Sequence, residues 1–350
     1  MTSLTQIAIQ ARKGIRYGIY LIIFLMVGKV ILDASVGIYL KVFPPAPPPP
    51  TVKFGKLTKI PFPTNNTSVK LTYTLETPTG GLPTDIPNQA KVYFMPKINA
   101  NLLALDVATQ KAKAMSFTSD PQQLSDILYK YTNPNFPSVL EMNIITGTFS
   151  VSYDLTADRT PINTKPPVAE VAASEFRATL SAANVLPDDL SGATTHDFLK
   201  LSSGKLVSAL SLSESDLVKI NLFRKDYDNL PSMTANPNQA NVWALISGST
   251  TRDQQIIAAE YHYHPVDESQ FSTYPIKTPA QAFAELQTGQ PFIANLGVNK
   301  DGSNLKIRRV YLAYFDPESE SDFYQPIYVF EGDNGFTAYV PAVASSYYGN

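Results

Sequence analysis

A long apolar stretch near the N-terminus, residues 17–40 (YGIYLIIFLMVGKVILDASVGIYL), constrains this chain more than any other feature. At about 1.5 Å per residue it makes a helix of roughly 36 Å, enough to cross the ~30 Å hydrocarbon core of a bilayer. Arg12, Lys13 and Arg16 precede it, whereas only Lys41 follows it directly. Because basic residues favour the cytoplasmic side, we expect a single-pass cell-membrane protein with a cytoplasmic N-terminus (residues 1–16), a signal anchor (17–40) and an extracytoplasmic bulk.

Two ionisable residues, Lys29 and Asp33, interrupt this apolar stretch. Each costs about 2.5–3.5 kcal/mol at the centre of a membrane helix, and a spacing of four places both on one helical face, where they can pair. Either the true span lies closer to the N-terminus, with Asp33 at the outer headgroups, or the pair contacts a partner helix inside the membrane. Cleavage of a signal peptide is a third interpretation, although the stretch is longer than usual for one and no convincing cleavage site follows.

A proline tract directly follows the anchor. Residues 41–50 (KVFPPAPPPP) favour an extended spacer, since polyproline II rises about 3.1 Å per residue and cannot continue a helix. The chain has 350 residues, so about 300 remain, which is room for two domains of ordinary size.

Composition excludes several classes of protein. The formal net charge is −2, with 28 basic and 30 acidic residues, so no nucleic-acid surface is indicated. The sequence contains no cysteine, which excludes disulfides, thiol chemistry and cysteine-based metal sites. The 28 prolines and 19 tyrosines favour a domain rich in strands and turns.

Periodicity and turn residues predict an α+β fold: the N-terminal transmembrane helix, then two related α+β domains, each an antiparallel sheet with a helix. We expect a first domain at 51–165, a helix-containing connecting region at 166–235 and a second domain at 236–350. The seven residues PNQAKVY at 87–93 recur as PNQANVW at 237–243, which suggests a repeat. Predicted helices lie at 102–115, 168–183 and 279–286. Predicted strands lie at 52–57, 69–75, 91–96, 139–145, 148–155, 216–223, 255–264, 308–314, 327–330 and 338–340.

Candidate catalytic or metal-binding residues are few. His262 and His264 alternate along a predicted strand and can share a metal with Asp267 or Glu268, but a third ligand at a definite spacing is missing, so a solvent-facing polar edge is the better interpretation.

The other polar motifs lack the sequence context that catalysis or calcium binding needs. Ser202 and Lys205 have the S-x-x-K spacing without its helix-start context, and the acidic loops 188–189 and 316–322 lack calcium-loop spacing, so we expect these loops to be solvated. We therefore expect no catalytic residue, no cofactor and no metal.

The C-terminal part contains the most recognisable sequence motifs. These are YPIKTPAQAF at 274–283 with Leu286 and Gly289, then VYLAY at 310–314 and QPIYVFEG at 325–332. Over residues 240–343 the chain resembles YycH and YycI. The resemblance implies a single-pass, N-in extracellular protein of Gram-positive bacteria, with a shape related to PepSY-type modules, that modulates the WalK sensor kinase. It supplies no catalytic residues.

The sequence thus predicts a non-catalytic membrane protein whose extracytoplasmic domain binds and modulates other envelope proteins, with a sensor kinase as one candidate partner. Exposed tyrosines and the acidic 316–322 loop are the expected contact surface, and Lys29 and Asp33 are the expected contact inside the membrane. Two alternatives stay open: a structural, oligomeric subunit of an envelope or secretion assembly, and an envelope hydrolase.

Overall fold

The computed structural model describes residues 3–42, 48–64, 70–289 and 291–349, and side chains over 8–39 and the later ranges. The chain forms two compact units, Met1–Pro49 and Pro50–Asn350.

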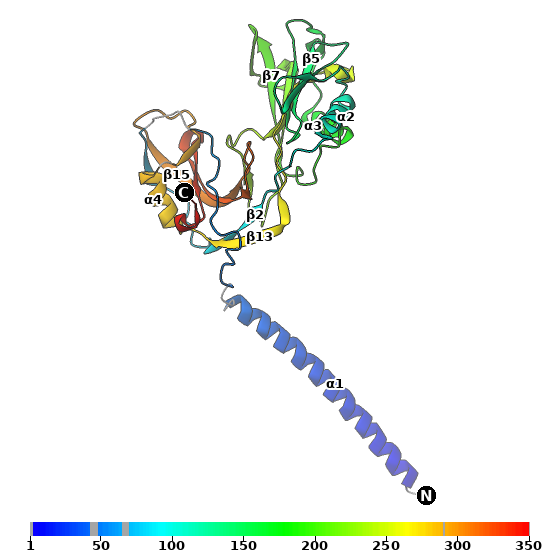
Figure 1. Cartoon of the computed structure of the whole chain (residues 1–350). Helices are drawn as coiled ribbons and strands as arrows, with labels where there is room; N and C mark the ends of the chain where they lie inside the picture. Colours follow the sequence, from blue (N-terminus) through cyan, green and yellow to red (C-terminus); the bar gives the residue numbers. More distant parts are fainter. Residues whose placement is uncertain (1–2, 43–47, 65–69, 290, 350) are drawn as a thin grey trace. The chain divides into compact units, whose positions relative to one another are not determined.

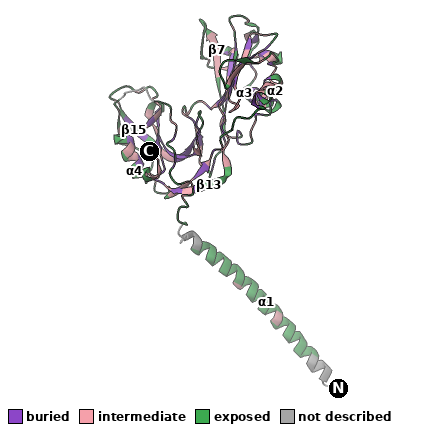
Figure 2. Cartoon of the chain, in the orientation of Figure 1, coloured by how far each residue is buried: buried purple, intermediate pink, exposed green. Residues whose placement is uncertain are grey.

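The first unit is the helix α1, Ser3–Val42 (Figure 1). Its 40 residues make about 60 Å of helix, so it extends beyond the predicted anchor at both ends. Apolar side chains along it are exposed, as Figure 2 shows in green; Phe24, for example, is 73% exposed. Within the described residues, Ala8–Tyr39 is the one segment long and apolar enough to cross a membrane, a property that anchors and signal sequences share. Half of the predicted spacer, residues 43–47, lies outside the described residues.

One part of the second unit is a nine-stranded antiparallel sheet, which with its helices we call the first lobe. Strand order is β3-β4-β5-β6-β12-β11-β9-β7-β8. Its strands are β3 (Gln122–Gln123), β4 (Leu128–Thr132), β5 (Ser138–Asn143), β6 (Phe149–Tyr153), β7 (Thr194–Ser202), β8 (Lys205–Ser208), β9 (Leu217–Leu222), β11 (Val242–Ile246) and β12 (Ile256–Tyr261). Burial alternates along β5 and β6, as expected for strands with one face on the core.

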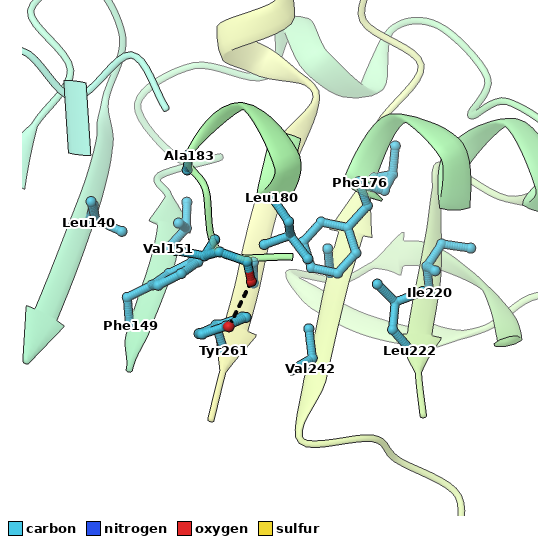
Figure 3. Close-up of a cluster of buried hydrophobic side chains, with 14 of the residues drawn as sticks. Leu140, Phe149, Val151, Phe176, Leu180, Ala183, Ile220, Leu222, Val242 and Tyr261 are labelled. Atoms are coloured by element: carbon cyan, nitrogen blue, oxygen red, sulfur yellow. Dashed lines mark hydrogen bonds between the residues drawn. The ribbon is translucent and has the colours of Figure 1, made fainter. Parts of the chain in front are cut away.

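Helices α2 (Ala104–Ala114) and α3 (Ala169–Ala182) share a hydrophobic core with this sheet. Figure 3 shows Phe176 and Leu180 of α3 directed toward the strands. Phe149 and Tyr261 stack there with ring centroids 4.9 Å apart, and the Tyr261 hydroxyl donates to the Val185 carbonyl at 2.7 Å. The buried hydroxyl therefore has the partner that burial requires.

The second lobe contains a six-stranded and a three-stranded sheet. In the larger, β1-β15-β17-β18-β14 form the ordered path and β10 also pairs with β15; in the smaller, β2 lies between β13 and β16. The larger sheet comprises β1 (Thr72–Leu75), β10 (Ser232–Met233), β14 (Phe292–Asn295), β15 (Asn304–Phe315), β17 (Pro326–Gly332) and β18 (Thr337–Pro341). The smaller comprises β2 (Gln89–Phe94), β13 (Asp267–Pro275) and β16 (Phe323–Tyr324). Within the described strands, β1 and β10 pair in parallel, both with β15, and the other ladders are antiparallel.

Helix α4 (Pro279–Thr288) packs on the larger sheet through Ala282 and Leu286. Its start is encoded locally: the Thr278 hydroxyl accepts from the Gln281 N–H, the Gln281 side chain accepts from the Thr278 N–H, and Pro279 occupies the first turn. Short 3-10 turns lie at Thr160–Ile162, Leu212–Glu214, Arg252–Gln254, Asp333–Gly335 and Ser345–Tyr347.

The α+β class with antiparallel sheets is confirmed, but strand pairing crosses the expected domain boundaries at 165 and 235. β6 pairs with β12, β1 with β15, and β2 with β13. The similar segments at 87–93 and 237–243 enter different sheets, through β2 and β11. The predicted strand at 52–57 was wrong: the segment forms turns, with one isolated bridge from Leu57 to Tyr348.

Candidate functional site

An open groove of about 710 Å³ lies between the two lobes of the second unit. One wall comes from the edge of the six-stranded sheet and the other from β11, β12 and the segment before β11. The lining residues are Pro63, Ala235, Asn236, Gln239, Ala240, Asn241, Trp243, Glu260, His262, Phe292, Ile293, Ala294 and Glu318.

The first wall is the edge strand β14. It pairs on one side with β18 and ends the strand order of its sheet. In an edge strand, alternate residues direct their N–H and C=O groups away from the sheet. Phe292, Ile293 and Ala294 of this strand line the groove, so backbone groups able to pair with another strand lie along it.

The second wall carries the chain's only tryptophan. Trp243 lies opposite Glu260 in the register of β11 and β12, and the Lys219 ammonium lies 4.5 Å from the centroid of its ring. His262 is the first residue after β12. Its Nε2 lies 2.9 Å from Glu260 Oε2 and 3.9 Å from Glu318 Oε1. The hydrogen bond to Glu260, together with the charge of Glu318, raises the pKa of His262 above 6.5. The groove thus combines an aromatic surface with two carboxylates that share one imidazole.

A buried arginine lies beside the groove and joins the two lobes. Arg224, which follows β9, has a side chain only 1% exposed. Its Nη1 donates to Asp189 Oδ2 at 2.6 Å, its Nε donates to Asp316 Oδ1 at 2.7 Å, and its Nη2 donates to the His264 carbonyl. Its guanidinium also lies 4.3 Å from the centroid of the Tyr263 ring. Asp189 belongs to the first lobe and Asp316 follows β15 of the second, so one side chain connects both.

The guanidinium of Arg224 pairs with two buried carboxylates, those of Asp189 and Asp316. Burial alone would lower the pKa of Arg224, but Asp316 and Asp189 outweigh it and hold that pKa well above its usual value. Burial raises the pKa of Asp316, and Arg224 offsets only part of this effect. Breaking such a buried pair is costly because it leaves a charge without water or a partner.

The backbone around Arg224 is closely packed as well. A Cβ on Gly192 would lie 1.9 Å from the Arg224 carbonyl oxygen, and the Lys225 N–H donates to the Asp189 carbonyl at 2.7 Å. Glycine is therefore the residue that lets this loop approach.

The expectation that loops 188–189 and 316–322 are solvated was wrong for Asp189 and Asp316, which are buried against Arg224. Glu318 and Asp322 are more accessible, with side chains 58% and 35% exposed. No local signal marks the buried pair, because its arginine lies far away in the sequence.

The two histidines proposed as metal ligands lie beyond the end of β12, and neither points to a shared site with the proposed acids. The His264 ring is buried, with Nε2 at 3.0 Å from the Glu318 carbonyl oxygen, and burial lowers its pKa. Asp267 accepts hydrogen bonds from Ser269 and Gln270, while Glu268 pairs with Lys225 at 2.6 Å. Among the described residues, no group of three His, Cys, Asp or Glu side chains is placed to hold a metal.

The remaining residues proposed from the sequence do not line the groove. Ser202 and Lys205 face each other across the β7–β8 hairpin, whose turn residues Ser203 and Gly204 have positive φ. Lys29 and Asp33 are exposed on α1, and within the described side chains no ion pair joins them. Their expected contact inside the membrane stays a prediction.

The expected surface of exposed tyrosines was largely wrong. Many tyrosines are fully buried, and several have defined hydroxyl partners: Tyr324 donates to Ser232 at 2.6 Å, and Tyr93 and Tyr314 donate to the Asp228 carboxylate at 2.7 and 3.1 Å. Tyrosine here fills the core between the sheets, where a ring that ends in a polar group can reach a partner.

No protein-family model matches the chain, and no curated protein matches it. Among solved structures, it is similar to an uncharacterised protein from Eubacterium rectale, with 12% identity over 73% of this chain and 82% of that one and a TM-score of 0.33. It is also similar to the C-terminal domain of YpeB from Bacillus megaterium, with 11% identity over 71% of this chain and 95% of that one and a TM-score of 0.31. Both TM-scores are low, and the resemblance to YycH and YycI stays a prediction.

Proposed function

We propose that this protein is a non-catalytic, membrane-anchored binding protein. Its extracytoplasmic unit takes up an extended segment of another envelope protein in the groove along β14. The observation that carries the proposal is an edge strand lining a 710 Å³ groove whose opposite wall holds Trp243.

Strand addition suits this geometry. A segment that pairs with β14 satisfies its outward backbone groups, and side chains on the far side of the segment reach Trp243. The charged lining residues Glu260, His262 and Glu318 favour a segment with a basic residue. Trp is also the kind of residue that anchors interfaces.

The anchoring part of the proposal rests on α1, whose apolar side chains are exposed over a length sufficient to span a bilayer. The basic residues before the helix favour an N-in orientation. The non-catalytic part rests on how the sequence's candidate residues are engaged: His264 is bound to a backbone carbonyl, and Glu268 is paired with Lys225.

Affinity purification of the full-length chain in mild detergent, followed by mass spectrometry, tests the proposal. We compare the wild type with Trp243→Ala, which removes the aromatic surface, and Glu318→Lys, which reverses an exposed charge at the groove. Leu210→Ala, at a side chain 93% exposed that does not line the groove, is the matched control.

A specific membrane or envelope protein should co-purify with the wild type and the control and be depleted in both groove variants. A partner lost only on the double change Lys29→Leu and Asp33→Leu would instead place binding in the membrane. Homogeneous self-assembly without another protein would refute the proposal and favour a structural subunit.

A further inference from the structure

A second cavity, of about 250 Å³, lies in the first lobe away from the β14 groove. It is formed by the end of α2, the β5–β6 turn, the segment after α3 and the chain beyond β12. Most of its wall is apolar or aromatic, including Ile98, Val185, Leu186, Tyr261 and Tyr263.

One cation, Lys111, lines this cavity, and none of the lining residues is acidic. The Lys111 ammonium lies beside the β5–β6 turn, 3.6 Å from where a Cβ on Gly147 would be. The residue is half-buried, and burial lowers the pKa of its ammonium. Within the described residues, Lys111 has no carboxylate, hydrogen-bond or aromatic partner, although a poorly hydrated ammonium gains most from one.

Two further polar groups line the cavity. The Thr146 hydroxyl lies 2.8 Å from the Thr148 hydroxyl and can accept from it while donating elsewhere. The Asn184 side chain is exposed, and within the described part of the chain its amide makes no hydrogen bond.

We infer that this cavity binds a small monocarboxylate with an apolar tail, its carboxylate on Lys111 and its tail against Val185, Leu186 and the tyrosine rings. A single positive charge matches one carboxylate better than a doubly charged phosphate. The apolar walls both suit a hydrocarbon chain and strengthen the ion pair by excluding water. This site is independent of the β14 groove.

Hexanoate is the probe, titrated calorimetrically into the full-length chain in lipid nanodiscs. For its eight heavy atoms we expect a dissociation constant on the order of 1 mM. Lys111→Met should weaken binding about tenfold or more, because a charge-assisted hydrogen bond is lost. Lys113→Met, at an exposed lysine two residues further along the same helix, should leave affinity within about twofold.

Hexylamine, with a similar tail and the opposite charge, should not bind. In the wild type, hexanoate should also raise the Lys111 pKa, measured by NMR at the ε-methylene, and this readout needs no variant. Absence of hexanoate binding, equal binding by Lys111→Met, or equal binding of hexylamine would each overturn the inference.

Discussion

Replacing Arg224 with methionine removes the cation that joins the two lobes and keeps most of the side chain's length. The guanidinium makes charge-assisted hydrogen bonds to Asp189 and Asp316 and is 1% exposed, so water cannot replace it. Removing one partner of a buried ion pair costs about 3–5 kcal/mol. The unfolding entropy of a unit of roughly 300 residues is about 0.6 kcal/mol/K, so Tm should fall by roughly 5–8 °C.

Differential scanning calorimetry of the full-length chain in nanodiscs measures this loss. Arg309→Met is the control, because Arg309 is 67% exposed and its pair with Glu331 at 3.0 Å should contribute at most about 1 kcal/mol. The Arg224→Met deficit should shrink as pH falls, since protonation neutralises the carboxylates left unpaired. Adding Asp189→Asn and Asp316→Asn should recover part of the loss. If Arg224→Met melts within about 2 °C of the control, the buried pair does not hold the lobes together.

Three further outcomes follow from individual contacts. Phe176→Ala should lower the free energy of unfolding by about 3–5 kcal/mol in denaturant titration, because this ring is buried between α3 and the nine-stranded sheet. Gly192→Ala should lower Tm, because its Cβ meets the Arg224 carbonyl; an unchanged Tm would show that the loop can shift. NMR titration should place the His262 pKa above 6.5 and the His264 pKa below it. The His262 contribution to stability is then fully present below about pH 6.5 and is lost as pH rises through its folded pKa. The His264 contribution behaves in the opposite way and is lost as pH falls below about 6.5. The variant Glu260→Gln should abolish the upward shift of the His262 pKa.

Local structure was predictable where neighbouring residues determine it. Helix α4 begins at the predicted Pro279 because Thr278 and Gln281 form a capping box within four residues. Helices α2 and α3 and the β5–β6 pair, with its turn at Gly147, also match the predicted segments within a few residues.

Strand pairing was not predictable, because it depends on segments far apart in the chain. The short strand β1 pairs with β15, more than two hundred residues later, and nothing in its four residues specifies that partner. Dividing the chain into consecutive domains therefore separated strands that the fold brings together. The predicted strand at 52–57 had suitable alternation but lacks a ladder to join, and alternation alone does not form a strand.

The candidate groove illustrates the same limit. From its sequence context His262 was expected on a solvent-facing polar edge, and the structure places it on the wall of the groove. In the sequence, Trp243 stands out only as part of the PNQANVW segment at 237–243. It becomes a candidate contact because β14, some fifty residues later in the chain, lines the same groove and ends the strand order of its sheet within the described residues. The groove exists because the fold brings two distant segments together, and the sequence of either segment alone looks like that of an ordinary strand.

The largest error in the predictions from sequence concerned the burial of charged residues, and it has a physical reason. Without a visible partner, an aspartate in a loop is expected to stay in water, since burial of a lone carboxylate is costly. Asp189 and Asp316 are buried because Arg224 reaches both, across sequence separations of 35 and 92 residues. The cost of burying each carboxylate is offset only when both lobes are in place around the guanidinium, so the lobes should unfold together. Arg224 is thus one of the contacts that join the two lobes within the compact unit Pro50–Asn350.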